Sequence, residues 1–175
     1  MRSHRSTLLV IPFLILIMVF VFRQREQENP LAAGINPDRV IVVKHGRTLS
    51  VMSRDKIIET YTVSLGRAPV GPKTQQGDHK TPEGQYVLDR RNASSRFYRS
   101  IHISYPDPNE RKRAAQLGID PGGDVMIHGL PNGFGRLGNL HRHLDCTDGC
   151  IAVTDEEMDE IWRTVPDGTP IEIKP

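Results

Sequence analysis

Short runs of β-branched residues follow one another from Arg39 onward and limit the folds open to this chain. Residues 39–44, 48–53 and 56–66 read RVIVVK, TLSVMS and KIIETYTVSLG, and only tight turns separate them. Partly alternating β-branched residues at this spacing are typical of strands. Because the connections are short, the three runs predict an antiparallel meander.

The stretch 65–84 is dense in glycine and proline and shows no periodicity, which predicts a long loop. A loop of this length inside a compact domain is usually functional or mobile. Strands are expected to resume at 85–89 (QYVLD) and at 100–104 (SIHIS). A further short strand, VMIHG, ends at His128.

The sequence predicts two helices. Asp107 is a suitable N-cap, Pro108 fits the first turn and Gly118 suits a left-handed C-terminus, and the polar residues between them indicate an exposed excursion. The second helix starts at a capping box formed by Thr154 and Glu157. Its core-facing stripe has helical spacing and consists of Met158, Ile161, Trp162 and Val165. With a last strand at 169–174, the whole is predominantly β with one or two flanking helices.

The N-terminus carries a different signal. An apolar run at 8–22 lies between arginines on both sides and is intermediate between a signal-peptide core and a full span of about 17–25 residues. We expect residues 1–25 to be an uncleaved membrane anchor, with a signal peptide cut near Ala32-Ala33-Gly34 as the second choice. A buried core helix is least favoured because the run is apolar all round. Residues 26–38 form a polar linker to a domain at 39–175.

Composition adds little about function. A chain of 175 residues with 37% hydrophobic content holds one ordinary domain beside that N-terminal segment. Its net charge of +2, without a dense basic stripe, argues against a nucleic-acid partner.

The two cysteines of the chain, Cys146 and Cys150, admit three interpretations. A disulfide between them would close a very short loop and therefore constrain the unfolded chain little. A metal site with the nearby His141 and His143 matches no usual zinc spacing, and these histidines read as ordinary polar-loop residues. The third interpretation makes one cysteine a nucleophile.

Cys150 suits the third interpretation best. It follows Gly149, which leaves approach to the thiol open and frees backbone N–H groups for an oxyanion, and it opens the apolar segment CIAV. A thiol needs a basic partner to react at neutral pH, and His128 at the end of its own strand is the candidate, although a structural role for this histidine stays open. Cys146 is expected to be an ordinary packed residue.

These motifs resemble a known family. VMIHG, a glycine-rich loop, TDGCIAVTDEEMDEIW and DGTPIEI, with GDHKTPEG upstream, are similar to the L,D-transpeptidase (YkuD-like) catalytic domain of bacterial cell-wall enzymes, in the subgroup with a TDGC signature. The resemblance runs from about Arg39 to the C-terminus. It implies a mainly β fold, an L,D-transpeptidase-like β-sandwich with one or two flanking helices.

The resemblance also implies roles for particular residues. Cys150 would be the nucleophile, His128 the base and Gly149 part of the oxyanion site, with substrate contacts from Thr147, Asp148 and Arg136. Arg91 and Arg96 are further basic residues that could face an anionic wall peptide, although ordinary solvated surface is the favoured interpretation of each.

The sequence departs from the family pattern in three places. The spacer between the motifs is longer, and Ala152 stands where many members have Arg or Asn. Asp148 stands where many have a second histidine, and this carboxylate tends to raise the thiol pKa unless it points toward a histidine or a substrate amine.

The expected function is that of an exported cysteine acyltransferase. It would take a peptidoglycan tetrapeptide as donor and an amine of a neighbouring stem or of a wall protein as acceptor, with no metal or organic cofactor. It would act at the periplasmic face of the bacterial inner membrane, or in the periplasm if the N-terminal segment is cleaved. The alternatives are an L,D-carboxypeptidase or amidase of the same fold, and a non-catalytic wall-binding module in which Cys146 and Cys150 are bridged.

Overall fold

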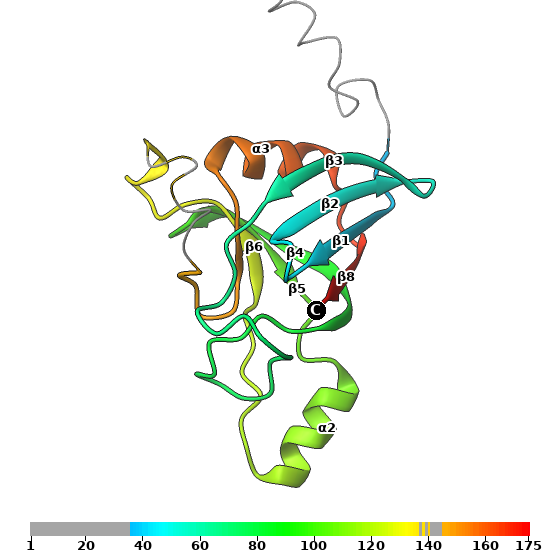
Figure 1. The fold of residues 1–175 in the computed structure, drawn as a ribbon, viewed down its shortest axis with the longest axis vertical. Coiled ribbons are helices and arrows are strands. Elements are labelled where there is room, and N and C mark those ends of the chain that lie inside the picture. Colours follow the sequence, from blue (N-terminus) through cyan, green and yellow to red (C-terminus); the bar gives the residue numbers. More distant parts are fainter. Residues whose placement is uncertain (1–35, 137, 139, 141–144) are drawn as a thin grey trace, which may run out of the picture. The chain divides into compact units, whose positions relative to one another are not determined.

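A computed structural model describes residues 36–136, 138, 140 and 145–175, and residues 36–175 form one compact unit (Figure 1). Among the described residues the strands are β1 (Arg39–Val43), β2 (Thr48–Ser53), β3 (Lys56–Thr62), β4 (Gly84–Ser95), β5 (Tyr98–Ile103), β6 (Met126–His128), β7 (Ile151–Ala152) and β8 (Pro170–Lys174), and the helices are α2 (Pro108–Leu117) and α3 (Asp155–Thr164). Neither helix is long and apolar enough to cross a bilayer. The apolar run at 8–22 lies outside the described residues.

The strands form one sheet in the order β3-β2-β1-β8-β4-β5-β6-β7. The predicted meander is confirmed, because β2 pairs antiparallel with both β1 and β3. The last strand, β8, inserts between β1 and β4 and is parallel to β1. The mainly β fold with two helices therefore agrees with the expectation from sequence.

Strand β4 connects the two parts of the sheet. Its first part, 84–87, pairs with β8, whereas its second part, 88–95, pairs with β5 across two register shifts. Such irregularities bend a strand and increase its twist. The sequence predicted only 85–89 as strand, because the continuation RRNASS is polar and lacks β-branched residues.

The segment that follows β3, at one edge of the sheet, pairs with β7 at the other edge. Ser64, just after β3, exchanges backbone hydrogen bonds of 3.0 and 2.9 Å with Ala152 of β7. The N–H of Arg67 then donates to the carbonyl of Thr147 at 3.0 Å, and the N–H of Thr147 donates to Leu65 at 3.2 Å. We call this pairing of residues 64–67 with 147–152 the seam. Cys150 therefore lies in a segment paired on one side with β6 and on the other with residues 64–67.

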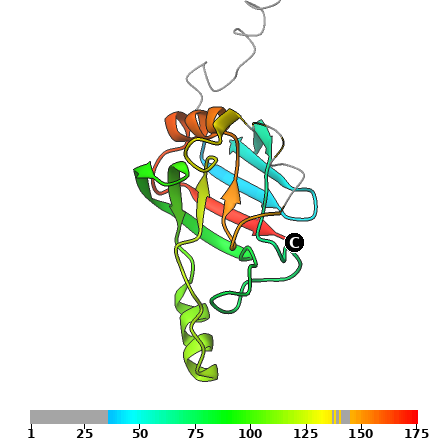
Figure 2. The same cartoon turned by 90° about the vertical axis from the view of Figure 1, so that its left-hand side faces the viewer.

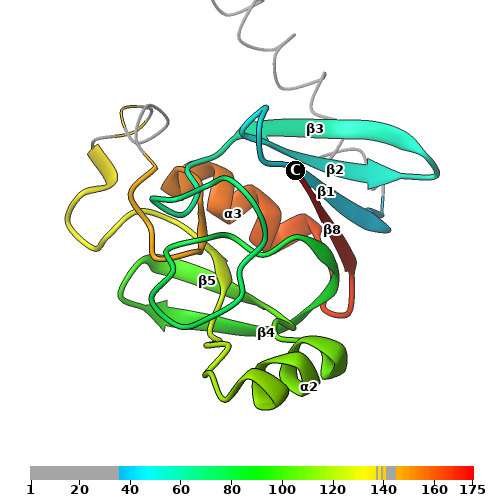
Figure 3. The same ribbon diagram turned by 60° about the horizontal axis from the view of Figure 1, so that its bottom comes forward.

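Helix α3 packs against the strands with three of the four residues of the predicted stripe, whereas Trp162 is only half-buried. The Thr154–Glu157 capping box is present, and Met158, Ile161 and Val165 are buried. Figure 3 shows the helix between the β1–β3 strands and the β4–β5 strands.

Arg91 of β4 holds the end of α3. Its guanidinium lies 4.8 Å from the centre of the Trp162 ring and donates to the carbonyls of Trp162 and Val165. These contacts satisfy carbonyls that a helix C-terminus leaves without partners. Arg91 therefore has a structural task, and the expectation that it faces a wall peptide is not supported.

Helix α2 is the exposed excursion that the sequence predicts. Asp107 caps it, Gly118 closes it in the left-handed conformation at φ 67°, and Ala114 is its buried residue. Figures 1 and 2 show α2 extending away from the strands. A hydrogen bond of 2.7 Å from the Tyr86 hydroxyl to Glu110 ties it to β4.

Candidate functional site

Cys150 and His128 lie on the same face of adjacent segments. β6 and β7 are parallel, and His128 is directly opposite Ala152. Side chains two residues apart along a strand share a face, so Cys150 and His128 are diagonal neighbours. The opposite face holds Ile127 and Ile151, which are completely buried. The strand register therefore places the two residues that the sequence singled out on one face of neighbouring segments.

The hydrogen bond of His128 determines its tautomer. Its Nδ1 lies 2.7 Å from the carbonyl oxygen of Gly129. A carbonyl only accepts, so Nδ1 must carry the hydrogen and Nε2 is the basic nitrogen. The Phe97 ring covers the imidazole, with ring centres 4.6 Å apart, and His128 is nearly buried. The histidine is therefore held in one orientation with a single nitrogen able to take a proton.

The thiol of Cys150 is predominantly neutral at rest. Burial raises its pKa above the ordinary value, the Asp148 and Asp124 charges raise it further, and a hydrogen bond from the backbone of Met126 and the charge of Lys73 act in the other direction. The thiol also donates weakly to the carbonyl oxygen of Asp124 at 3.7 Å. A cysteine in this setting needs a base at the moment of attack.

This environment predicts the pH dependence of alkylation. Because the folded pKa is raised, the thiolate fraction is small at neutral pH, and the rate of reaction with iodoacetamide should climb steadily from about pH 7 to pH 10. The measurement uses a Cys146→Ser variant, so that a single thiol reacts. A rate already at its plateau below pH 7 would indicate a resident thiolate and contradict the prediction.

A compact turn precedes the thiol. The Thr147 hydroxyl donates to the carbonyl of Cys150 at 2.8 Å and accepts from the N–H of Gly149 at 3.1 Å. Thr147 is nearly buried, so its hydroxyl serves the turn. The same contact occupies the N–H of Gly149. Any role of Gly149 in catalysis must then come from its lack of a side chain and from its backbone conformation, not from its own N–H.

Two glycines allow a loop backbone to lie across the seam. Gly149 has φ 127°, and a Cβ there would lie 2.6 Å from the carbonyl oxygen of Lys80. A Cβ on Gly66 would lie 2.2 Å from the carbonyl oxygen of His79 and 3.2 Å from the Cα of Gly149. Both approaches are closer than a methyl group permits. The backbone of residues 79–80 therefore packs directly against Gly66 and against Gly149, the residue before Cys150.

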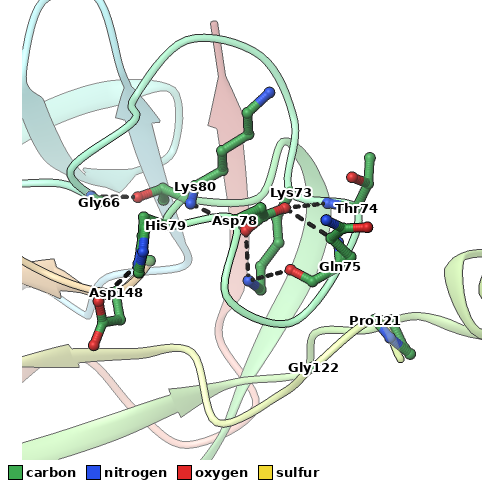
Figure 4. Close-up of polar contacts among 12 residues, drawn as sticks. Gly66, Lys73, Thr74, Gln75, Asp78, His79, Lys80, Pro121, Gly122 and Asp148 are labelled. Atoms are coloured by element: carbon green, nitrogen blue, oxygen red, sulfur yellow. Dashed lines mark hydrogen bonds and ion pairs between the residues drawn. The ribbon is translucent and has the colours of Figure 1, made fainter. Parts of the chain in front are cut away.

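That backbone belongs to the predicted long loop, which buried ion pairs hold in place. The side chains of Lys73 and Asp78 are 3% and 9% exposed and pair at 2.8 Å (Figure 4). Asp78 also accepts backbone N–H groups of Thr74, Gln75 and Lys80. The loop, for which the sequence indicated a functional or a mobile role, is thus held in place by these contacts and lies beside Cys150.

A second buried lysine, in the position that follows β1, supports the same loop. The ammonium of Lys44 donates to the carbonyls of Gly71 and Thr81 at 2.7 and 2.9 Å and to the Glu83 carboxylate at 2.8 Å. All three of its donors are used, as burial of a charge requires.

Asp145 anchors the start of the cysteine segment and corrects one expectation. Its nearly buried carboxylate accepts from the Arg47 guanidinium and from the Leu65 N–H. In an extended chain the next residue points the other way, so Cys146 is exposed rather than packed. The prediction of a buried Cys146 is wrong. Both cysteines are free thiols in this structure.

Asp148 points away from the core into an exposed charged cluster. Its Oδ1 accepts from Nη2 of Arg67 and lies 2.9 Å from Nδ1 of His79, a contact visible in Figure 4. The hydrogen bond from Arg67 is the largest cause that keeps the pKa of Asp148 below its ordinary value. The carboxylate thus faces a histidine, one of the two orientations considered from sequence, and it still contributes to raising the thiol pKa.

The remaining sequence candidates are not gathered at the thiol. Arg136 is exposed after β6, and no contact joins it to Cys150 among the described residues. His141 and His143 lie outside those residues. Within the part that the structure describes, no group of three His, Cys, Asp or Glu side chains is arranged to hold a metal ion.

The solved structures contain a similar fold. The helical cell shape determining protein Pgp2 of Campylobacter jejuni superposes with a TM-score of 0.63 at 25% identity, over 80% of this chain and 48% of that chain. The features described above define a mainly β domain with a cysteine and a histidine on one face of adjacent segments.

The family follows from the sequence match. Residues 37–173 match the model of the L,D-transpeptidase catalytic domain, YkuD, so the chain belongs to this family. YafK of Escherichia coli K12, named provisionally as an L,D-transpeptidase, is 29% identical over 74% of this chain and 48% of its own length. YqjB of Bacillus subtilis, named in the same provisional way, is 29% identical over 81% of this chain and 72% of its own. The chain thus spans about half the length of YafK and Pgp2.

Proposed function

We propose that this protein is a cysteine acyltransferase that acts on peptidoglycan stem peptides. Family membership supports the substrate class. The observation that carries the chemistry is the placement of the Cys150 thiol on the same face as a nearly buried His128 whose Nδ1 is fixed by the Gly129 carbonyl. The active form is exported and held at the periplasmic face of the inner membrane through residues 1–25, or is free in the periplasm if that segment is cleaved.

The first half-reaction transfers the donor to sulfur. Nε2 of His128 takes the thiol proton as Sγ attacks the carbonyl at the L-centre of the diamino acid in a tetrapeptide. The resulting oxyanion collapses, its C–N bond breaks, and the imidazolium returns the proton to the departing D-alanine amine. The enzyme is left with a thioester on Cys150 and a neutral histidine.

The second half-reaction consumes the thioester. An acceptor amine, on a neighbouring stem or on a wall protein, attacks the carbonyl and loses a proton to His128. The C–S bond then breaks, and the imidazolium returns that proton to the sulfur, which restores the thiol and the neutral histidine. Oxyanion donors come from the backbone beside the sulfur. Because Thr147 occupies the Gly149 N–H, the N–H of Cys150 itself is the nearest candidate.

Purified muropeptides test this function. We expect the protein to convert disaccharide tetrapeptides into cross-linked dimers with release of D-alanine, as followed by liquid chromatography with mass detection. Trimmed tripeptide monomers without dimers would assign it to the L,D-carboxypeptidases instead. Failure to change any muropeptide or to release a wall-linked protein would leave the non-catalytic wall-binding alternative.

A further inference from the structure

The cluster of Arg67, His79 and Asp148 lies beside the thiol and has no task in the reaction steps above. We propose that Arg67, supported by His79, binds a carboxylate of the stem peptide, and that Asp148 occupies this subsite until the substrate carboxylate displaces it. The inference rests on the proposed function, because it names how that same site recognises its donor.

The backbone fixes Arg67 relative to the nucleophile. Its N–H donates to the carbonyl of Thr147 at 3.0 Å across the seam, and the next N–H, of Ala68, donates to the carbonyl of His79 at 3.0 Å. Three segments, around residues 67, 79 and 148, therefore lie side by side. Arg67 is set directly across from the turn that carries Cys150 rather than on a separate loop.

The present contacts of the cluster resemble those that a bound carboxylate would make. One oxygen of Asp148 contacts both Nη2 of Arg67 and Nδ1 of His79. The side chains of Arg67 and Asp148 are 54% and 75% exposed, so their ion pair contributes at most about 1 kcal/mol and is easily exchanged. Among the described residues, nothing contacts Nε or Nη1 of Arg67, which leaves further donors for a two-point bond to a carboxylate.

Other cations near the thiol are less suitable. Lys73 is buried and already paired with Asp78. Arg90 is 65% exposed and its Nη2 lies 3.7 Å from the carboxylate of Asp124, whose carbonyl contacts the thiol. This loose pair makes Arg90 a matched control: an exposed arginine beside an aspartate near Cys150, outside the seam.

Binding to a protein that cannot react gives the direct test. In a Cys150→Ser background, calorimetry measures the dissociation constant of a tetrapeptide stem. We expect Arg67→Ala to weaken binding about tenfold or more, Arg67→Lys to weaken it less, and Arg90→Ala to change it less than about twofold. Asp148→Asn should tighten binding, because it removes the competing carboxylate while preserving shape.

Amidated peptides identify the group that is recognised. Stems amidated singly, at the terminal carboxylate or at the free carboxylate of the diamino acid, are compared with the unmodified stem. The Arg67→Ala effect should disappear for one of them. An effect that persists with both carboxylates amidated, equal losses for Arg67→Ala and Arg90→Ala, or weaker binding in Asp148→Asn would each overturn the proposal.

Kinetics separate this inference from the proposed function. In the reactive protein we expect Arg67→Ala to raise KM while kcat changes little, since the contact holds the donor before and during attack. Normal turnover with an unchanged KM would refute the Arg67 subsite alone. If the unsubstituted protein forms no thioester or product, the acyltransferase assignment fails, and the binding series still decides the role of Arg67.

Discussion

Incubation with a carbapenem should add the mass of one drug molecule to the protein, and a Cys150→Ala variant should gain none. A carbapenem resembles an acyl donor to this class, and opening its ring joins the carbonyl to sulfur without a leaving group. The same substitution should lower transfer from muropeptides by at least about a thousandfold, as expected when the nucleophile of a covalent mechanism is removed. Intact-mass spectrometry reads the first effect and chromatography the second.

Cys146→Ser is the matched control for this experiment. Cys146 is the more exposed of the two thiols, and it belongs to the same turn. We expect the variant to form the adduct at the rate of the unsubstituted protein. If the adduct still forms in Cys150→Ala, or no longer forms in Cys146→Ser, the assignment of Cys150 as the nucleophile is wrong.

Replacing Lys73 by Met should destabilise the domain by about 3 kcal/mol, because it leaves the carboxylate of Asp78 buried without its cation. The contact of residues 79–80 with Gly149 should also weaken, because the same ion pair holds their loop in place, and activity should therefore fall. Urea unfolding measures the free energy. The control is Asp55→Asn, which breaks an ion pair with side chains 39% and 90% exposed and should cost less than about 1 kcal/mol.

The same pair predicts how stability depends on pH. Burial works to raise the pKa of Asp78, yet hydrogen bonds from Lys73 and from backbone N–H groups lower it to about 2. A depressed carboxyl pKa contributes stability above the ordinary value of 3.8 that is lost as the pH falls toward 2. The unsubstituted protein should therefore lose more stability than Asp78→Asn on acidification from about pH 5 to pH 2. Parallel acid titrations would contradict this assignment.

Local patterns were sufficient to predict most elements of the fold. The caps at Asp107, Gly118 and Thr154 lie where the residue types indicate, because a helix end is decided by a few neighbouring side chains. The second part of β4 was missed because its partner β5, rather than its own composition, makes it a strand.

The sequence singled out only the central pair of the candidate site. It pointed to Cys150 and His128 because few residue types act as nucleophile and base. The supports were missed: nothing in the sequence singles out Lys44 or Lys73, since only the folded chain places Glu83 and Asp78 against their ammonium groups. Arg67 gave no signal, because its partner Asp148 is remote in sequence and meets it only across the seam.

The seam also limits how the gene can change around Cys150. β7 has only two residues, both buried, and its neighbours on both sides fix which of them shares a face with Cys150. Insertion or deletion of one codon between Asp145 and Cys150 would move the sulfur to the opposite face, where Ile151 now fills the core. Length variation among descendants of this sequence should therefore accumulate before Asp145 rather than after it.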